Sequence, residues 1–453
     1  MAKIVIIGAG LTGLSAAYHL EKKGYFDYKI FEKDAGAGGL CRSVVHDGFT
    51  FDYTGHLLHI GDSYFQSLIS SLVGMEHFNS INRRSFIYSH NVYTHYPFQI
   101  NLFGLPPEVV AECIEGFVLR KKIGKKDSFY NWALAYFGKG IARNFFFPYQ
   151  KKIFAYDIKK ITSTWTGRFV PSTSLTQMIQ GAIKDPTETV GVGYNAHFYY
   201  PKQGGIFFWV NKIARALKNP IKVQYEVEKI DLKSKTVLFT NGEYEKFETL
   251  ISTMPLDHLL ARVSEKSTTH FAQQQKKLIC NSVINFNIGV KRTDLSDKHW
   301  IYFPENNYPF YRIGFPHNFS QATVPAGCSS LYGELSYINK SKKYCNALLT
   351  ESLRAAKTLL HIKEQDIVTE KIITIPHAYV IYDFWRERNL PKLLKRLQDN
   401  DIYSIGRYGA WKYSSMQEAV LDGKKVADEL IVMPATKAYF VQPPEYSNQK
   451  ELG

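Results

Sequence analysis

The chain of 453 residues is long enough for two or three domains with sizeable cores, and its 45% hydrophobic and 21% charged residues are typical of a soluble globular protein. Lysine and arginine exceed aspartate and glutamate by 56 − 41 = 15, which favours anionic partners. No run of eighteen apolar residues and no recognised nucleic-acid-binding module occurs, so we expect neither an integral membrane segment nor a nucleic-acid partner.

The first forty residues predict a strand, a glycine-rich turn, a helix and a second strand. Residues 3–7 are a short apolar run, Gly8, Gly10 and Gly13 form a G-x-G-x-x-G turn, and residues 11–22 carry apolar side chains at helical spacing. Such a turn brings the backbone and a helix N-terminus against a pyrophosphate. Glu32 ends the second strand, at residues 28–31, where its carboxylate can accept hydrogen bonds from an adenosine ribose.

A second glycine-rich loop follows Glu32 and contains Gly38, Gly39 and Leu40. It resembles the ExxxxxGG loop of the glutathione-reductase-like FAD proteins, and an NAD domain would not need it. The resemblance implies FAD as the cofactor, with NADPH or NADH acting at most as an external reductant.

The remaining patterns predict an α/β fold in which a Rossmann-like FAD-binding domain carries a helical insertion and an antiparallel-sheet substrate domain. We expect a discontinuous FAD-binding domain at residues 1–80, 195–275 and 395–433. The helical insertion is expected at 100–190, the substrate domain at 81–99 and 276–394, and a flexible tail at 434–453. Within the FAD-binding domain, residues 221–230 are expected to form one strand.

The five cysteines have neither CxxC nor metal-ligand spacing, so the sequence predicts no metal site. Their odd number, with no signal peptide before the first expected strand, indicates a reducing cytoplasm. The sequence leaves open whether the chain forms a homo-oligomer.

Seven further segments occur in order along the chain and resemble those of the UDP-galactopyranose mutases, most of all the eukaryotic-type branch. They are DYTGH (52–56), HYPFQIN (95–101), FPYQKKIF (147–154), WTGR (165–168), NAHFxYPxxGG (195–205), YFPENNxPFYR (302–312) and GRYGxWKY (406–413). The resemblance implies an isomerase without net redox change. In that reaction reduced FAD attacks the anomeric carbon of UDP-galactopyranose, or a related nucleotide sugar, through N5, and the sugar recloses as a furanose.

The resemblance also implies roles for individual residues. Arg168 and Arg312 would hold the diphosphate, because a guanidinium donates in pairs and stays charged. Tyrosine hydroxyls would also donate hydrogen bonds to the phosphates, and other residues would contact the base, the sugar and the flavin. The implied residues are Tyr302, Tyr379 and Tyr413 for the phosphates, Tyr96, Gln99, Gln150 and Phe154 for the uridine, Asn195 for the sugar or ribose, and His56, Arg83, Arg407 and Met416 for the flavin side.

Five positions depart from the family pattern: Thr54 replaces a glycine, Gln150 an asparagine, Phe154 a tryptophan, Phe319 a tyrosine and His59 a phenylalanine. Three of these changes surround the base, the phosphates or the sugar. We therefore hypothesise that the sugar, or the nucleotide, differs from that of UDP-galactose.

Two other functions are compatible with the N-terminal pattern. One is a flavin oxidase or desaturase resembling the amine oxidases and protoporphyrinogen oxidase, which would act on an amine or apolar substrate. The other is a non-catalytic flavoprotein that binds a nucleotide sugar as a regulator. Neither an amine nor an apolar substrate would require paired arginines.

Overall fold

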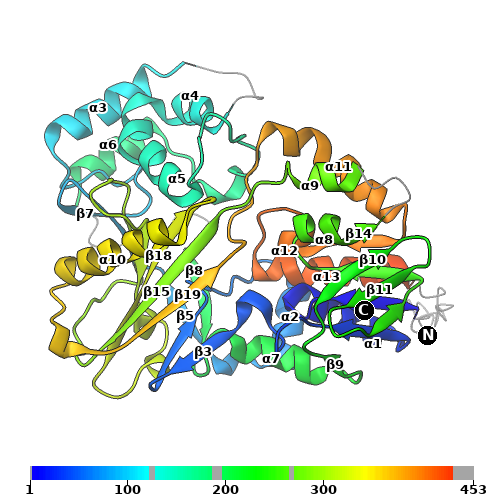
Figure 1. Cartoon of the computed structure of the whole chain (residues 1–453). Coiled ribbons are helices and arrows are strands. Elements are labelled where there is room, and N and C mark those ends of the chain that lie inside the picture. The colour runs from blue at the N-terminus through cyan, green and yellow to red at the C-terminus, as the bar shows by residue number, and fades with distance from the viewer. Residues whose placement is uncertain (1–2, 122–127, 186–195, 265–269, 432–453) are drawn as a thin grey trace, which may run out of the picture.

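The computed structural model describes residues 3–121, 128–185, 196–264 and 270–431 (Figure 1). The Asn195 site prediction and the tail at 434–453 lie outside these residues. Within them, no helix combines the length and the apolar character needed to cross a bilayer.

A parallel five-stranded sheet contains the first and the last strand of the described residues. Its order is β20 (Ile402–Ser404), β13 (Thr249–Ser252), β1 (Ile4–Ile7), β2 (Tyr28–Phe31) and β9 (Ile221–Lys222). Every neighbouring pair is parallel. Helix α1 (Leu11–Lys22) connects β1 to β2 and packs against α13 (Met416–Leu430) so closely that a Cβ on Gly423 would lie 2.6 Å from the Ala16 amide nitrogen.

The single strand expected at 221–230 is wrong, because the structure divides it between two sheets. Residues of β9 join the parallel sheet, whereas β10 (Val227–Asp231) belongs to a second sheet with β12 (Tyr244–Lys246), β11 (Thr236–Phe239) and β14 (Val263–Ser264). Between β9 and β10, Gln224 has a φ of 64°, which is incompatible with an extended strand.

The largest sheet has seven strands in the order β19 (Ile367–Ile375), β15 (Ser282–Val290), β18 (Ser329–Tyr337), β17 (Arg312–Gly314), β16 (Trp300–Tyr302), β6 (Ser85–Ser89) and β7 (Val92–His95). Helix α10 (Lys342–Leu359) packs beside it (Figure 1). The sheet is mixed, which corrects the expected antiparallel sheet: β6 arrives from an early part of the chain and pairs in parallel with β16.

A group of helices stands at one end of this sheet (Figure 1). It comprises α3 (Pro107–Val118), α4 (Phe129–Ile141), the π-helical segment η3 (Ala142–Phe146), α5 (Phe147–Phe154) and α6 (Leu175–Ile183). Glycines allow α3 and α4 to approach closely, since a Cβ on Gly140 would lie 2.1 Å from the Glu112 carbonyl oxygen.

The remaining elements connect these layers. They are two-stranded pairs, β3 (Ser43–His46) with β4 (Phe49–Asp52) and β5 (Phe78–Asn82) with β8 (His197–Pro201); the helices α2 (Ser63–Leu72), α7 (Phe207–Ala216), α8 (Leu256–Arg262), α9 (His270–Gln275), α11 (Phe384–Gln398) and α12 (Gly406–Gly409); and the short 3-10 helices η1 (Gly39–Cys41), η2 (Met75–His77), η4 (Gly167–Phe169), η5 (Pro316–Asn318), η6 (Gln321–Thr323) and η7 (Glu364–Asp366).

Candidate functional site

The turn between β1 and α1 is a cradle that requires glycine at positions 8 and 13. Gly8 has a φ of 96°, and a Cβ on Gly13 would lie 1.9 Å from the Gly8 carbonyl oxygen. A Cβ on Gly10 would come within 3.9 Å of Gly39, so the two glycine-rich loops face each other. The first turn of α1 has no side-chain cap, which leaves backbone N–H groups available to an anion.

Glu32 and the second glycine loop complete this cradle. One oxygen of the buried Glu32 carboxylate accepts a hydrogen bond from the Ala9 amide at 2.8 Å, and the other accepts one from Asp34 at 3.0 Å. A carboxylate can accept about four hydrogen bonds, so capacity for ribose hydroxyls remains. Gly38, with a φ of 112°, donates to the Ala9 carbonyl at 2.8 Å, and Leu40 lies in the following η1. These features fit the adenosine diphosphate part of FAD.

Arg407 and Met416 lie where the chain returns to the parallel sheet. The Arg407 guanidinium donates to the Ser414 carbonyl at 2.7 Å and the Ala378 carbonyl at 3.2 Å. Met416 begins α13, whose N-terminus is closed by a capping box between Ser415 and Glu418. Arg407 therefore contributes a fixed positive charge, while the α13 N-terminus is already partly satisfied.

His56 is neutral at pH 7 and feels the positive charges of two arginines. Burial, together with the charges of Arg407 and Arg312, lowers its pKa to about 4. Its Nδ1 is buried and has no hydrogen-bond partner among the described residues. Such an orphaned polar atom fits a site that a polar ligand or cofactor completes.

Arg312 is held by Glu334, a residue that the sequence patterns did not single out. The two residues are directly opposite on β17 and β18. Nε and Nη2 of Arg312 donate to the same carboxylate oxygen at 3.1 and 2.6 Å, and Glu334 is fully buried. Burial alone would lower the pKa of Arg312, but the charge of Glu334 and the neighbouring tyrosine hydroxyls together outweigh it and hold the pKa well above its ordinary value. The other Glu334 oxygen has no partner among the described residues.

Predicted tyrosines lie near both arginines, with Tyr302 opposite Arg312 in the pairing of β16 and β17. Tyr379 and Tyr413 stack with their centroids 6.0 Å apart, and the Arg407 guanidinium lies 4.8 Å from the Tyr413 ring. Tyr96 and Tyr302 lie 5.1 Å apart. Burial raises the pKa values of Tyr379, Tyr413 and Tyr96, so these hydroxyls stay protonated and can donate hydrogen bonds at neutral pH.

The structure also places most of the remaining predicted residues. Arg83 lies 4.8 Å from the Tyr96 ring, and Phe154 packs edge-on against Tyr379 at 6.3 Å. Gln99 is buried and donates to the Pro171 carbonyl at 2.7 Å, so part of its amide is already engaged. The buried Gln150 carbonyl oxygen has no partner among the described residues.

Two departures from the family pattern lie beside the β5–β8 pair. Phe319 packs against Phe198 and Tyr200 at 5.7 and 5.4 Å between ring centroids. His59 donates from Nδ1 to the His197 carbonyl at 3.2 Å. Both are therefore engaged with β8.

Arg168 lies in η4, but its side chain is outside the described parts of the chain, as is the whole of Asn195. Their proposed roles stay predictions.

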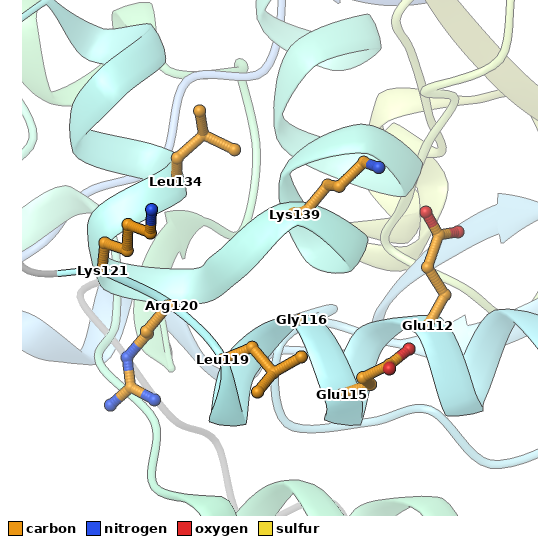
Figure 2. Close-up of a pocket in the computed structure, with 8 residues that line it drawn as sticks. All are labelled: Glu112, Glu115, Gly116, Leu119, Arg120, Lys121, Leu134 and Lys139. Carbon is orange, nitrogen blue, oxygen red and sulfur yellow. The ribbon is translucent and has the colours of Figure 1, made fainter.

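A hollow of about 470 Å³ lies elsewhere, between α3 and α4 (Figure 2). Its lining is largely charged and includes Glu112, Glu115, Arg120, Lys121 and Lys139. None of the predicted site residues lines it.

Comparisons with known proteins agree with a flavoprotein fold. The sequence model of the flavin-containing amine oxidoreductases matches residues 11–431. The chain is similar to a reduced UDP-galactopyranose mutase, with 30% identity, a TM-score of 0.88 and 95% of each chain covered. It shares its fold with a candidate protoporphyrinogen oxidase from Exiguobacterium sp. 255-15, with 14% identity and a TM-score of 0.72 over 94% of this chain and 98% of that one.

Among curated proteins, the chain matches a 4,4'-diapophytoene desaturase (4,4'-diaponeurosporene-forming) of Staphylococcus aureus strain bovine RF122 / ET3-1. The two are 35% identical over 91 residues, which are 20% of this chain and 18% of the desaturase. The match thus spans less than a fifth of the desaturase's length.

Proposed function

The chain belongs to the family of flavin-containing amine oxidoreductases. Within this family we propose that it is a flavin-dependent nucleotide-sugar mutase. It would interconvert the pyranose and furanose forms of UDP-galactose or a related nucleotide sugar. The observation that supports this proposal is the positive charge of Arg312 and Arg407, which both lower the pKa of His56, together with tyrosines that burial keeps protonated. Fixed positive charge with hydroxyl donors suits a diphosphate. The similarity to a reduced UDP-galactopyranose mutase over 95% of both chains supports the same assignment.

FAD is the cofactor, and the turn at Gly8, Gly10 and Gly13, the Glu32 carboxylate and the loop at Gly38 would hold its adenosine diphosphate part. When bound in its reduced form, the flavin supplies a nucleophilic ring nitrogen.

The protein's own groups would bind and orient the substrate. Arg312 is aimed by Glu334 and would hold the diphosphate both before and after it leaves the sugar, which favours its return rather than its loss to solvent. Tyr379 and Tyr413 would donate hydroxyl protons to phosphate oxygens, where negative charge grows as the glycosidic bond breaks. His56 would stay neutral, so it adds no third positive charge there.

An oxidase or desaturase is the alternative function, favoured by the match to a diapophytoene desaturase. An apolar or amine substrate would offer no acceptor to the Arg312 guanidinium donors that Glu334 does not engage. We therefore prefer an anionic substrate.

In the distinguishing experiment, the holoprotein is reduced with dithionite and incubated with UDP-galactopyranose in the absence of oxygen. Chromatography then follows the nucleotide sugars. The mutase proposal predicts a furanose product at many turnovers per flavin. Absence of product, together with oxygen consumption on an amine or porphyrinogen, would favour the oxidase instead.

A panel of other nucleotide sugars tests the altered-substrate hypothesis that arose from Gln150, Phe154, Phe319 and His59. We expect another sugar or nucleotide to be turned over faster than UDP-galactopyranose. Preferred and efficient turnover of UDP-galactopyranose would reject that hypothesis and leave the mutase proposal intact.

A further inference from the structure

Three metal-ligating side chains gather outside the proposed flavin and nucleotide site. Asp257 and His258 lie in the first turn of α8, and His377 lies in the loop after β19, 120 residues away along the chain. One ligand atom from each lies within 4.8 Å of the other two. We propose that Asp257, His258 and His377 bind one divalent transition-metal ion of the zinc class.

The geometry of the three groups is close to that of a metal site. His377 Nε2 lies 2.9 and 3.1 Å from the two Asp257 oxygens, and the rings of His258 and His377 stand at 88° with their centroids 4.7 Å apart. Ligand atoms around a tetrahedral zinc ion are about 3.4 Å apart, so the longest separation, up to 4.8 Å, must shorten by up to ~1.4 Å. Small side-chain rotations supply such a change.

Two imidazoles and a carboxylate favour zinc, cobalt or nickel over magnesium or calcium, which prefer oxygen ligands alone. A metal ion binds a carboxylate in its ionised form and an imidazole in its neutral form, so binding would release any proton that these groups carry.

The charge around the cluster makes Asp257 essential to the proposal. Lys33 and Arg262 contribute positive charge near His258 and would oppose a cation. The Asp257 carboxylate is the anionic group among the three ligands. Neutralising this carboxylate should therefore weaken metal binding at least as much as removing one imidazole.

The ion would connect two parts of the proposed site. On one side, the Thr253 hydroxyl, four residues before Asp257, donates to the Ile7 carbonyl at 3.0 Å beside the dinucleotide turn. On the other, Ala378 follows His377 and its carbonyl accepts the Arg407 bond at 3.2 Å. A bound ion would thus hold the loop that contains Tyr379 against the start of α8, which follows strand β13 of the parallel sheet. It would stabilise the native state because it binds that state in preference to the unfolded chain.

The test titrates chelator-treated, oxidised holoprotein with zinc chloride against a colorimetric zinc indicator and measures bound zinc by elemental analysis. At a zinc concentration that saturates wild type, wild type should bind one ion per chain more than His258→Ala, His377→Ala or Asp257→Asn. The affinity of each of these three variants for zinc should be at least tenfold lower than that of wild type. Zinc should also raise the melting temperature of wild type but not of the variants. The control is His46→Ala, which alters an exposed His–Asp pair at 3.6 Å.

Equal zinc stoichiometry and affinity in wild type and the three variants would overturn the proposal, and would assign any binding to cysteines or other groups. Absence of saturable binding to wild type would do the same, leaving the cluster as a hydrogen-bonded His–Asp pair. Each variant is accepted only with wild-type flavin content. If an alanine variant loses flavin, Asp257→Asn decides, because it preserves side-chain size. These readouts do not depend on mutase activity.

Discussion

Replacing Arg312 with lysine should weaken nucleotide binding while leaving the fold intact. A guanidinium has five N–H donors, and two of those of Arg312 are committed to Glu334, which leaves three for an anion. A lysine has three donors in total, and one would be drawn to Glu334. At least one charge-assisted hydrogen bond to the diphosphate is then lost, at about 1.5–3 kcal/mol, or roughly 10- to 150-fold in the dissociation constant.

Isothermal titration of oxidised holoprotein with UDP measures this change directly. The matched control is Arg292→Lys, whose guanidinium also pairs with a carboxylate, that of Asp294 at 2.9 Å. We expect unchanged UDP affinity for the control. An Arg312→Lys dissociation constant within threefold of wild type, at normal flavin content, would refute the role assigned to Arg312.

Three other predictions concern the glycine turn of the flavin site and the protonation of His56. Gly13→Ala should abolish flavin binding or folding, because a Cβ 1.9 Å from the Gly8 carbonyl oxygen costs about 3 kcal/mol or more, whereas Gly36→Ala, which meets nothing within 4 Å, should retain flavin by absorbance. The His56 ring should show no protonation above pH 5 by NMR, since its pKa is about 4; a midpoint near 6.5 would contradict this. Because the pKa of folded His56 lies below its unfolded value, its contribution to stability is complete above pH 6.5 and is lost as the pH falls through 4, by about 3 kcal/mol in full. His56→Asn should therefore melt with less acid sensitivity than wild type.

The dinucleotide-binding unit could be predicted from sequence because its signals are local. The apolar run at residues 3–7, the glycines and the helical periodicity lie within thirty residues, and the structure has β1, α1 and β2 at Ile4–Ile7, Leu11–Lys22 and Tyr28–Phe31. The strand expected at 221–230 failed because the positive φ of Gln224 has no strong sequence signal.

Long-range pairings were beyond such patterns. Glu334 looks like any polar residue in a strand until β17 places Arg312 opposite it. The parallel pairing of β6 with β16 joins segments more than 200 residues apart. Asp257 and His377 are likewise brought together only by the fold. The family segments compensated in part, because Arg312 and Tyr413 lie within them and were singled out without knowledge of these contacts.

The central claim is that this protein rearranges a nucleotide sugar without net oxidation. The most direct measurement reduces the holoprotein once, adds a nucleotide-sugar panel without oxygen, and records the ring form of each sugar by NMR alongside the flavin absorbance. We predict pyranose–furanose interconversion far beyond one turnover per flavin, with the flavin still reduced at the end. The claim would be contradicted if every sugar of the panel stayed unchanged and if, in a parallel sample of oxidised holoprotein, an amine or a polyene precursor reduced the flavin stoichiometrically.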